Sequence, residues 1–180
     1  MLHKDWKNIV DDSWTLFLDR DGVINERIID GYVKCYNEFT FLPLVKESFI
    51  KFSNIFKRII IVSNQQGVGK GLMSIDEVQT IHDLMQHEIE QAGGRIDAIF
   101  VCPQLKSIPN NFRKPSPQMA LMAKERFTEI DFSKSIMVGD TASDIEFGKN
   151  FGAHTILIDT ELKFNADDSF TSLYKFSETL

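Results

Sequence analysis

The chain runs from the apolar stretch Trp14-Thr15-Leu16-Phe17-Leu18 directly into Asp19-Arg20-Asp21-Gly22-Val23. The first stretch is short, β-prone and followed by turn residues, so it predicts a buried strand. In an open α/β sheet, ligands bind at the carboxyl ends of the strands. Two carboxylates therefore leave a core strand together, and Gly22 lets the chain turn away. Such a pair can hold a hard cation, divide nucleophilic and acid/base roles, or simply cap a loop.

The composition is that of an ordinary globular domain. The chain has 180 residues, 43% hydrophobic and 26% charged, which excludes a disordered or fibrous protein and is enough for a substantial core. We expect a single domain over residues 1–180. The net charge is −6 without any run of Lys or Arg, which argues against nucleic acid or an anionic membrane as a partner.

The start of the chain and the cysteines favour a cytoplasmic protein. Residues 1–6 lack the apolar core of a signal peptide, and the longest aliphatic run, Ile59 to Val62, is too short to span a bilayer. Cys35 and Cys102 have no disulfide framework around them, so reduced thiols are expected. We predict a cytoplasmic monomer or small homo-oligomer.

Short apolar runs alternate with helical patterns along the rest of the chain. Ser74 and Glu77 form a capping box that begins a helix ending near Gly93. Ser116 and Pro117 are predicted as the cap and first-turn residue of another, and further helices are expected over 43–56 and 142–151. Strands are expected at 14–18, 58–62, 98–101, 135–138 and 154–158. This alternation predicts an α/β fold, a three-layer doubly wound parallel sheet.

The end of the chain is expected to pack on this sheet. Residues 163–180 are predicted as a strand or loop followed by a helix that packs through Phe170, Leu173 and Phe176. No functional role is expected for this tail.

Polar side chains also follow two later predicted strands. Ser63-Asn64-Gln65-Gln66-Gly67 presents a hydroxyl, amides and backbone N–H groups where an anion could sit. Gly139-Asp140-Thr141-Ala142-Ser143-Asp144 follows a second strand, and Arg113-Lys114-Pro115 places two cations in a loop. Each has a structural alternative: a turn cap, a solvated charge, or a first-turn residue stabilised by the helix dipole. Their common position at strand ends and their complementary chemistry favour one shared site.

These motifs, in this order, resemble those of the haloacid dehalogenase (HAD) superfamily of phosphohydrolases. Asp19 and Asp21 match the first motif, Ser63 the second and Lys114 the third. The resemblance implies that Asp19 attacks phosphorus to give an aspartyl phosphate. It implies that Asp21 protonates the leaving oxygen and then deprotonates water, while Lys114 and Ser63 hold the phosphoryl oxygens. An acid at position 21 indicates phosphoryl transfer rather than dehalogenation.

The fourth motif is matched by Asp140 and Asp144. The resemblance implies that Mg²⁺ is held by the Asp19 carboxylate, the Asp21 backbone carbonyl and Asp140, with Asp144 orienting Lys114 or metal-bound water. A phosphate dianion repels a carboxylate nucleophile, so cations must neutralise charge in the transition state. The spacings between motifs leave no room for a cap domain, so loops should roof the site and provide its selectivity.

Within the superfamily, the chain resembles the histidinol-phosphate and heptose-bisphosphate phosphatase group. Gly31-Tyr32-Val33 favours the heptose branch, which implies 7-phosphatase activity on D-glycero-D-manno-heptose 1,7-bisphosphate. The alternatives are histidinol phosphate and other small-metabolite or nucleic-acid 3′ phosphates. The resemblance implies that eight residues lie around the substrate: Asn25, Gly31, Tyr32, Asn64, Gln65, Lys70, Arg113 and Thr141. Of these, Arg113 could bind a second phosphate.

The chain departs from this group at its zinc loop. Members usually begin the loop with Cys-Pro-His and end it with Cys-x-Cys-Arg-Lys-Pro, whereas this chain has Cys102-Pro103-Gln104 and Asn111-Phe112-Arg113-Lys114-Pro115. A single thiolate cannot make a tetrahedral site. We therefore expect Mg²⁺ but no zinc.

Other motifs indicate less. Gly67-Val68-Gly69-Lys70-Gly71 lacks the Ser or Thr of a nucleotide-binding P-loop, and His82 and His87 stand at i,i+5 rather than at a ligand-like i,i+4.

The alternative from a different class is a receiver-like signalling module, which is also phosphorylated on a strand-end Asp. Asp21 argues against it, because a long-lived phosphoryl switch gains nothing from a residue poised to hydrolyse it.

Overall fold

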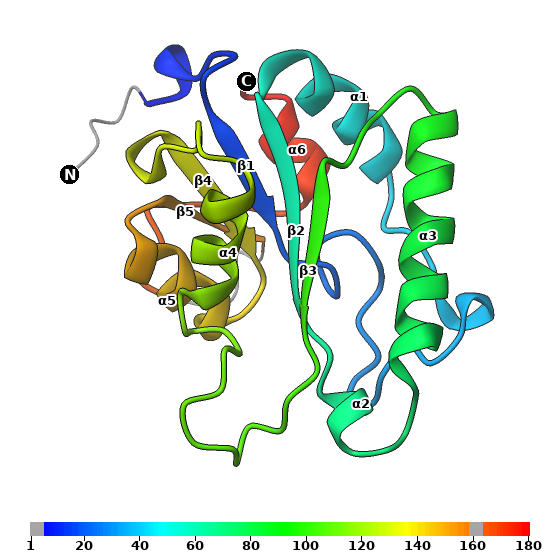
Figure 1. Cartoon of the computed structure of the whole chain (residues 1–180). Coiled ribbons are helices and arrows are strands. Elements are labelled where there is room, and N and C mark those ends of the chain that lie inside the picture. Colours follow the sequence, from blue (N-terminus) through cyan, green and yellow to red (C-terminus); the bar gives the residue numbers. More distant parts are fainter. Residues whose placement is uncertain (1–5, 159–163) are drawn as a thin grey trace.

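The predicted strands form one sheet in the computed structural model, which describes residues 6–158 and 164–180 (Figure 1). Six parallel strands follow the order β3-β2-β1-β4-β5-β6. The strands are β1 (Thr15–Leu18), β2 (Arg58–Asn64), β3 (Ala98–Cys102), β4 (Ser135–Gly139), β5 (His154–Ile158) and β6 (Asp168–Phe170).

Helices cover both faces of the sheet, as predicted for a doubly wound fold (Figure 1). They are α1 (Val45–Ile55), α2 (Gln66–Gly69), α3 (Ile75–Gln91), α4 (Gln118–Arg126), α5 (Ala142–Phe151) and α6 (Leu173–Ser177). Three short 3₁₀ helices are η1 (Trp6–Ile9), η2 (Tyr36–Glu38) and η3 (Phe132–Lys134). The predicted capping box begins α3, and Gly152, at φ 87°, ends α5.

Alternate strand residues divide the core into two layers. In β1, Leu16 and Leu18 pack in the cluster that contains the buried apolar residues of α1, α3 and α6, whereas Phe17 packs in the cluster that contains apolar residues of α4 and α5. Strands β2 and β4 alternate in the same way. Period-two alternation between two apolar faces is the reason that these strands read as continuous apolar runs in the sequence.

The order of the strands locates a crevice. The chain builds outward from β1 to β2 and β3, then crosses back to place β4 on the other side of β1. Leu18 pairs with Ile61 of β2 and with Val138 of β4, so the residues that follow these three strands meet at one edge. In doubly wound sheets ligands bind at this reversal, outside the carboxyl ends.

Two expectations were wrong in detail. Helix α4 begins at Gln118, and Pro117 rather than Ser116 is its N-cap, because Pro117 O accepts the first helical hydrogen bond, from Leu121 N at 3.0 Å. Phe170 lies in β6 rather than in the final helix, and its ring contacts Phe176 of α6 at 5.6 Å between centroids.

The signal-peptide assessment falls mainly on residues 1–5, which lie outside the described residues, as does His3. Among the described helices, none is long and apolar enough to cross a membrane.

Candidate active site

Asp19 lies at the carboxyl end of β1, near the middle of the sheet. Its backbone N–H donates to Val138 O of β4 at 2.9 Å. The residue is 6% exposed. Its Oδ1 accepts the backbone N–H of Arg20 at 2.7 Å and contacts Lys114 Nζ at 2.8 Å. Both of these contacts use Oδ1, so Oδ2 is the oxygen more available to a ligand.

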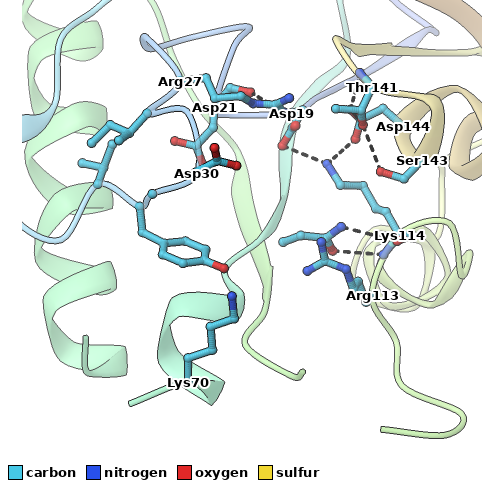
Figure 2. A pocket seen from close by; sticks show the side chains of 15 residues that line it. Asp19, Asp21, Arg27, Asp30, Lys70, Arg113, Lys114, Thr141, Ser143 and Asp144 are labelled. Atoms are coloured by element: carbon cyan, nitrogen blue, oxygen red, sulfur yellow. Dashed lines mark hydrogen bonds and ion pairs between the residues drawn. The ribbon is translucent and has the colours of Figure 1, made fainter. Parts of the chain in front are cut away.

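Lys114 is a buried ammonium between two carboxylates (Figure 2). Its Nζ lies 2.8 Å from Asp19 Oδ1 and 2.6 Å from Asp144 Oδ1, and it donates to Val62 O at 2.8 Å. Burial lowers the pKa of an ammonium, but the charges of Asp144 and Asp19 outweigh burial and hold the pKa of Lys114 above its ordinary value. The lysine is therefore charged at neutral pH.

Asn64 fixes the backbone of Lys114 from β2. Its Oδ1 accepts the N–H of Lys114 at 3.0 Å, and its Nδ2 donates to the carbonyl of the same residue at 3.4 Å. Two motifs that are far apart in the sequence are thus joined by a reciprocal pair.

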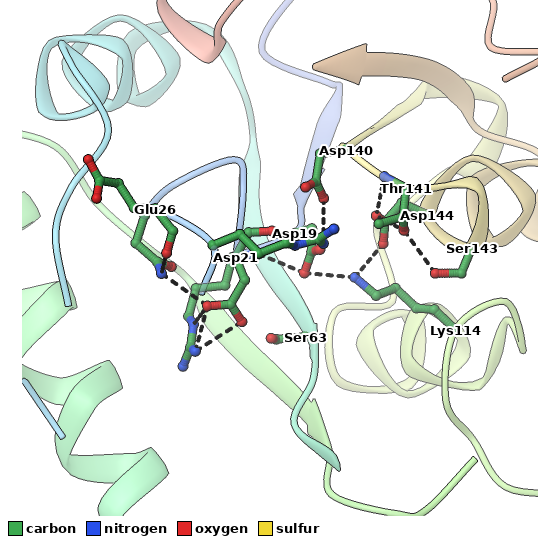
Figure 3. A network of polar contacts seen from close by, with 12 residues as sticks. Asp19, Asp21, Glu26, Ser63, Lys114, Asp140, Thr141, Ser143 and Asp144 are labelled. Carbon is green, nitrogen blue, oxygen red and sulfur yellow. Dashed lines mark hydrogen bonds and ion pairs between the residues drawn. The ribbon is translucent and has the colours of Figure 1, made fainter. Parts of the chain in front are cut away.

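Asp140 and Asp144 form an acidic cluster with Asp19 (Figure 3). Carboxylate oxygens of the three residues lie within 4.8 Å of one another. Asp144, in the first turn of α5, accepts the N–H of Thr141 at 3.0 Å. A Cβ on Gly22, whose φ is +91°, would lie 1.9 Å from Oδ2 of Asp140, so the turn after Asp21 requires glycine.

The electrostatics of this cluster fit a divalent cation. Burial, together with the charge of Asp144 and against that of Lys114, raises the pKa of Asp19 to about 6. Burial and repulsion from Asp19 raise the pKa of Asp140 to about 8, although Arg27 opposes the shift. The described side chains therefore supply too little positive charge for the carboxylates, and hard oxygen ligands of this kind suit Mg²⁺.

Asp21 lies in a different environment, surrounded by donors. Arg20 Nη2 donates to both of its carboxylate oxygens, at 2.8 and 2.9 Å. Asn25 Nδ2 and Gln65 Nε2 donate to it at 3.0 and 2.9 Å. Burial raises the pKa of Asp21, but the charge and hydrogen bonds of Arg20, with the two amides, outweigh burial and hold this pKa below its ordinary value. The side chain is still 25% exposed.

Arg20 is fully buried and contacts His82 of α3 behind Asp21. Arg20 Nη1 lies 3.1 Å from His82 Nε2. A guanidinium has donors only, so Nε2 must be the acceptor and the proton of the neutral ring is on Nδ1. Burial and the charge of Arg20 lower the pKa of His82 to about 3, against the opposing charge of Asp21. No role for Arg20 or His82 follows from their sequence positions alone.

Arg27 is a site residue that the sequence analysis missed. Its Nη2 donates to Asp140 Oδ1 at 2.9 Å and to the backbone carbonyl of Asp21 at 3.2 Å. These are two of the oxygens expected to bind Mg²⁺. The contact with Asp140 spans 113 residues of sequence, so no local signal could have revealed it.

A pocket of about 430 Å³ opens beside Asp19, Asp21, Lys114 and Asp144. In Figure 2, Arg113 and Lys70 lie on the lower side of this pocket, away from Asp19. The predicted substrate residues that line it are Gly31, Tyr32, Asn64, Lys70, Arg113 and Thr141. Further lining residues, not predicted, are Arg27, Ile28, Asp30, Val33 and Ser143.

Four predicted site residues lie outside this lining. Asn25 and Gln65 are buried and direct their amides to Asp21, and Ser63 Oγ accepts from Gln65 Nε2 at 2.8 Å. Asp140 is also outside the lining but within the acidic cluster. Signals for Asn25 and Gln65 came from motif resemblance, which marks proximity to the site but not the direction of the side chain.

Comparison with known proteins finds similarity to HAD-like hydrolases and to heptose-bisphosphate phosphatases. A family model described as HAD-hydrolase-like matches residues 111–172. The chain is 38% identical over 171 residues to a D-glycero-alpha-D-manno-heptose-1,7-bisphosphate 7-phosphatase of Mycobacterium bovis, covering 92% of this chain and 90% of the relative. It is 32% identical over 156 residues to a D-glycero-D-manno-heptose-1,7-bisphosphate 7-phosphatase of Chlorobaculum tepidum, covering 81% and 78%.

The solved structures that resemble this fold include a phosphatase of the same kind. The D,D-heptose 1,7-bisphosphate phosphatase of B. bronchiseptica, crystallised with magnesium and phosphate, superposes with a TM-score of 0.82 at 27% identity, covering 92% of this chain and 96% of that one. A dehalogenase superposes with a TM-score of 0.64 at 11% identity, covering 95% and 98%, which is a likeness of fold alone.

Proposed function

The chain belongs to the D-glycero-D-manno-heptose-1,7-bisphosphate 7-phosphatase family of HAD-like hydrolases, and we propose that it hydrolyses the 7-phosphate of such a heptose bisphosphate. The observation that carries the proposal is the meeting of Asp19, Lys114 and the acidic cluster beside a pocket lined by further cations. As a phosphatase, the chain is not a receiver-like module.

Asp19 and Asp21 divide the chemistry in this proposal. An oxygen of Asp19 forms a bond to phosphorus as the bond from phosphorus to the sugar oxygen breaks, and Asp21 gives its proton to that sugar oxygen. Asp21 then takes a proton from water, which attacks the aspartyl phosphate and frees Asp19 and inorganic phosphate.

The first step requires a protonated Asp21, whereas the free protein holds this carboxylate ionised. A bound phosphate dianion raises the pKa of a neighbouring carboxyl by like-charge repulsion. We therefore propose that substrate binding raises the pKa of Asp21 enough to protonate it, although the charge of Arg20 lowers that pKa.

Lys114 and Ser63 hold the phosphoryl oxygens in this proposal, and Asp144 orients Lys114 through their 2.6 Å contact. Asp19, the carbonyl of Asp21, Asp140 and Asp144 are the residues that would hold Mg²⁺. When bound, Mg²⁺ supplies positive charge against the phosphoryl oxygens. EDTA should abolish activity and added Mg²⁺ should restore it, while retained activity in excess EDTA contradicts this assignment.

The second phosphate is assigned to Arg113, with Lys70 and Tyr32 nearby. Nη1 of Arg113 is shielded from solvent and has no hydrogen-bond partner among the described residues. Lys70 Nζ lies over the ring of Tyr32, 5.3 Å from its centroid. A buried guanidinium nitrogen without an acceptor favours a ligand that brings one, and phosphate accepts in a bidentate way.

The test compares heptose 1,7-bisphosphate with p-nitrophenyl phosphate, using ³¹P NMR to identify which phosphate leaves. Arg113→Ala should lower kcat/KM for the bisphosphate on the order of 10- to 100-fold, the value of hydrogen bonds to a charged group, and affect p-nitrophenyl phosphate much less. Lys106→Ala is the matched control, because Lys106 lies in the same loop but outside the pocket lining.

Equal losses for both substrates would place Arg113 in the reaction centre or in the fold. No preference of the wild type for the bisphosphate would favour histidinol phosphate or a generic phosphomonoester. The single domain over residues 1–180, the cytoplasmic location and the oligomeric state stay predictions.

A further inference from the structure

The loop that carries Arg113 lacks the residues for the zinc site of the group that it resembles. Cys102, Gln104, Asn110 and Phe112 stand at the four ligand positions. Only the thiol of Cys102 is a common zinc ligand, and a structural site needs four ligands of nitrogen or sulfur type. Burial raises the pKa of this thiol, which disfavours the thiolate that binds metal. These residues do not fit zinc, so the loop needs another means of closure.

The side chain of Gln104 makes that closure. Its Oε1 accepts the backbone N–H of Phe112 at 3.0 Å. The same oxygen lies 3.9 Å from Sγ of Cys102, within reach of a weak thiol hydrogen bond. One amide therefore joins three of the four positions, 102, 104 and 112, that a metal would otherwise hold together.

This contact acts on Arg113 more directly than on Lys114. Phe112 immediately precedes Arg113, whose N–H donates to Asn111 Oδ1 at 3.0 Å within the same loop. Lys114 is held independently by Asn64 of β2 and by its two carboxylates. Opening of the contact between Gln104 and Phe112 would thus free the arginine first.

We propose that Gln104 replaces the metal of this loop and is a positioning residue for Arg113. Its amide closes residues 103–112 and presents the guanidinium to the pocket. The closure itself does not depend on the activity of the protein. Only its effect on substrate rests on the proposed function, through the role of Arg113.

Trypsin measures the closure without any substrate, because Lys106 is exposed within the loop. Gln104→Leu keeps the approximate volume of the side chain but removes the oxygen that accepts from Phe112. Gln104→Glu keeps an acceptor oxygen at the same position. Cleavage after Lys106, followed by mass spectrometry, should be about fivefold faster in Gln104→Leu, as loss of one ordinary hydrogen bond predicts. Gln104→Glu should be close to the wild type.

The substrate readout is a split between KM and kcat. In Gln104→Leu, the KM for the heptose bisphosphate should rise by a similar factor, while kcat changes less, and Gln104→Glu should restore KM. Should Gln104→Leu fail to fold, Gln104→Asn replaces it, since a side chain one methylene shorter withdraws the acceptor from Phe112.

The proposal is overturned by wild-type cleavage in Gln104→Leu, or by equal lability of the Leu and Glu variants. One zinc ion per wild-type chain, whose removal by a chelator accelerates cleavage after Lys106, would also overturn it. A wild type that does not hydrolyse the bisphosphate contradicts the proposed function, but the cleavage rates still decide whether Gln104 closes the loop.

Discussion

Asp19 and Asp21 leave the same strand two residues apart, yet their surroundings shift their pKa values in opposite directions. Burial and the charge of Asp144 raise the pKa of Asp19 to about 6, against Lys114. Around Asp21, burial also raises the pKa, but Arg20 and two amides reverse the shift. The carboxylate of Asp19 belongs to the acidic cluster, whereas the carboxylate of Asp21 is paired with the guanidinium of Arg20.

The difference shows how a single turn can place two carboxylates in environments that suit the two proposed roles. A nucleophile in an acidic cluster is suited to work with an added cation, whereas an acid/base group needs a fixed direction toward the pocket. Arg20 gives Asp21 this direction, and His82 holds Arg20 from behind. The predictions below alter one side of this comparison at a time.

The largest effect is expected from Asp19→Asn. Asparagine keeps the shape but removes the proposed nucleophile and one charge of the acidic cluster, so release of phosphate from p-nitrophenyl phosphate should fall below detection. Far-UV circular dichroism should show an unchanged fold. Turnover near that of the wild type would exclude the covalent mechanism.

Asp21→Asn should slow turnover by about 10²- to 10⁴-fold, the usual contribution of a positioned acid/base group. Because Asp19 is intact in this variant, phosphoenzyme should accumulate when a good leaving group removes the need for the acid. Acid quenching with radiolabelled phosphate donor measures it. Undiminished turnover would remove Asp21 from this role.

Arg27→Ala tests the cation that already contacts the acidic cluster. Its guanidinium shares Asp140 and the carbonyl of Asp21 with the proposed metal, so its loss should tighten Mg²⁺ binding by about two- to fivefold, the size of an exposed ion pair. Isothermal titration calorimetry measures the affinity. Lys70→Ala removes another cation of the same pocket; equal tightening in both variants would indicate a general field effect rather than competition at the two oxygens.

His82, the buried support of Asp21, is expected to change the free energy of unfolding. His82 has a folded-state pKa of about 3 and an ordinary value near 6.5 when unfolded. Between these values the unfolded chain binds a proton that the folded protein does not, so stability is lost as pH falls from about 6.5. His82→Gln lacks this linkage. The wild type therefore loses stability as pH falls and the variant does not lose this contribution. The difference in unfolding free energy between the two proteins should shrink by at most about 1.4 kcal/mol per pH unit.

Urea unfolding at pH 7, 5.5 and 4.5 measures this convergence. A constant difference between His82→Gln and the wild type over this range would mean that His82 titrates normally in the folded protein. NMR provides a direct check, since the His82 ring should keep the chemical shifts of a neutral imidazole down to pH 5.

The sequence predicted the parts of the molecule that depend on local pattern. Apolar runs identified strands β1 to β5, and the resemblance placed Asp19, Lys114 and Asp144 at one site, where the structure brings them together. It did not distinguish residues that line the pocket from those behind Asp21, because Asn25 and Tyr32 belong to the same motif region but face different surroundings. That distinction depends on packing between distant segments, as does the contact of Arg27 with Asp140.

The loop closed by Gln104 also divides the catalytic groups between two halves of the chain. Asp19, Asp21 and β1 to β3 precede it, while Lys114, Asp140, Asp144 and β4 to β6 follow it. The two halves meet where β1 pairs with β4, in a register that sets Leu18 against Val138. A chain nicked in this loop would therefore carry incomplete chemistry on each fragment, and recovered turnover would report that the two pieces had reassembled along that seam.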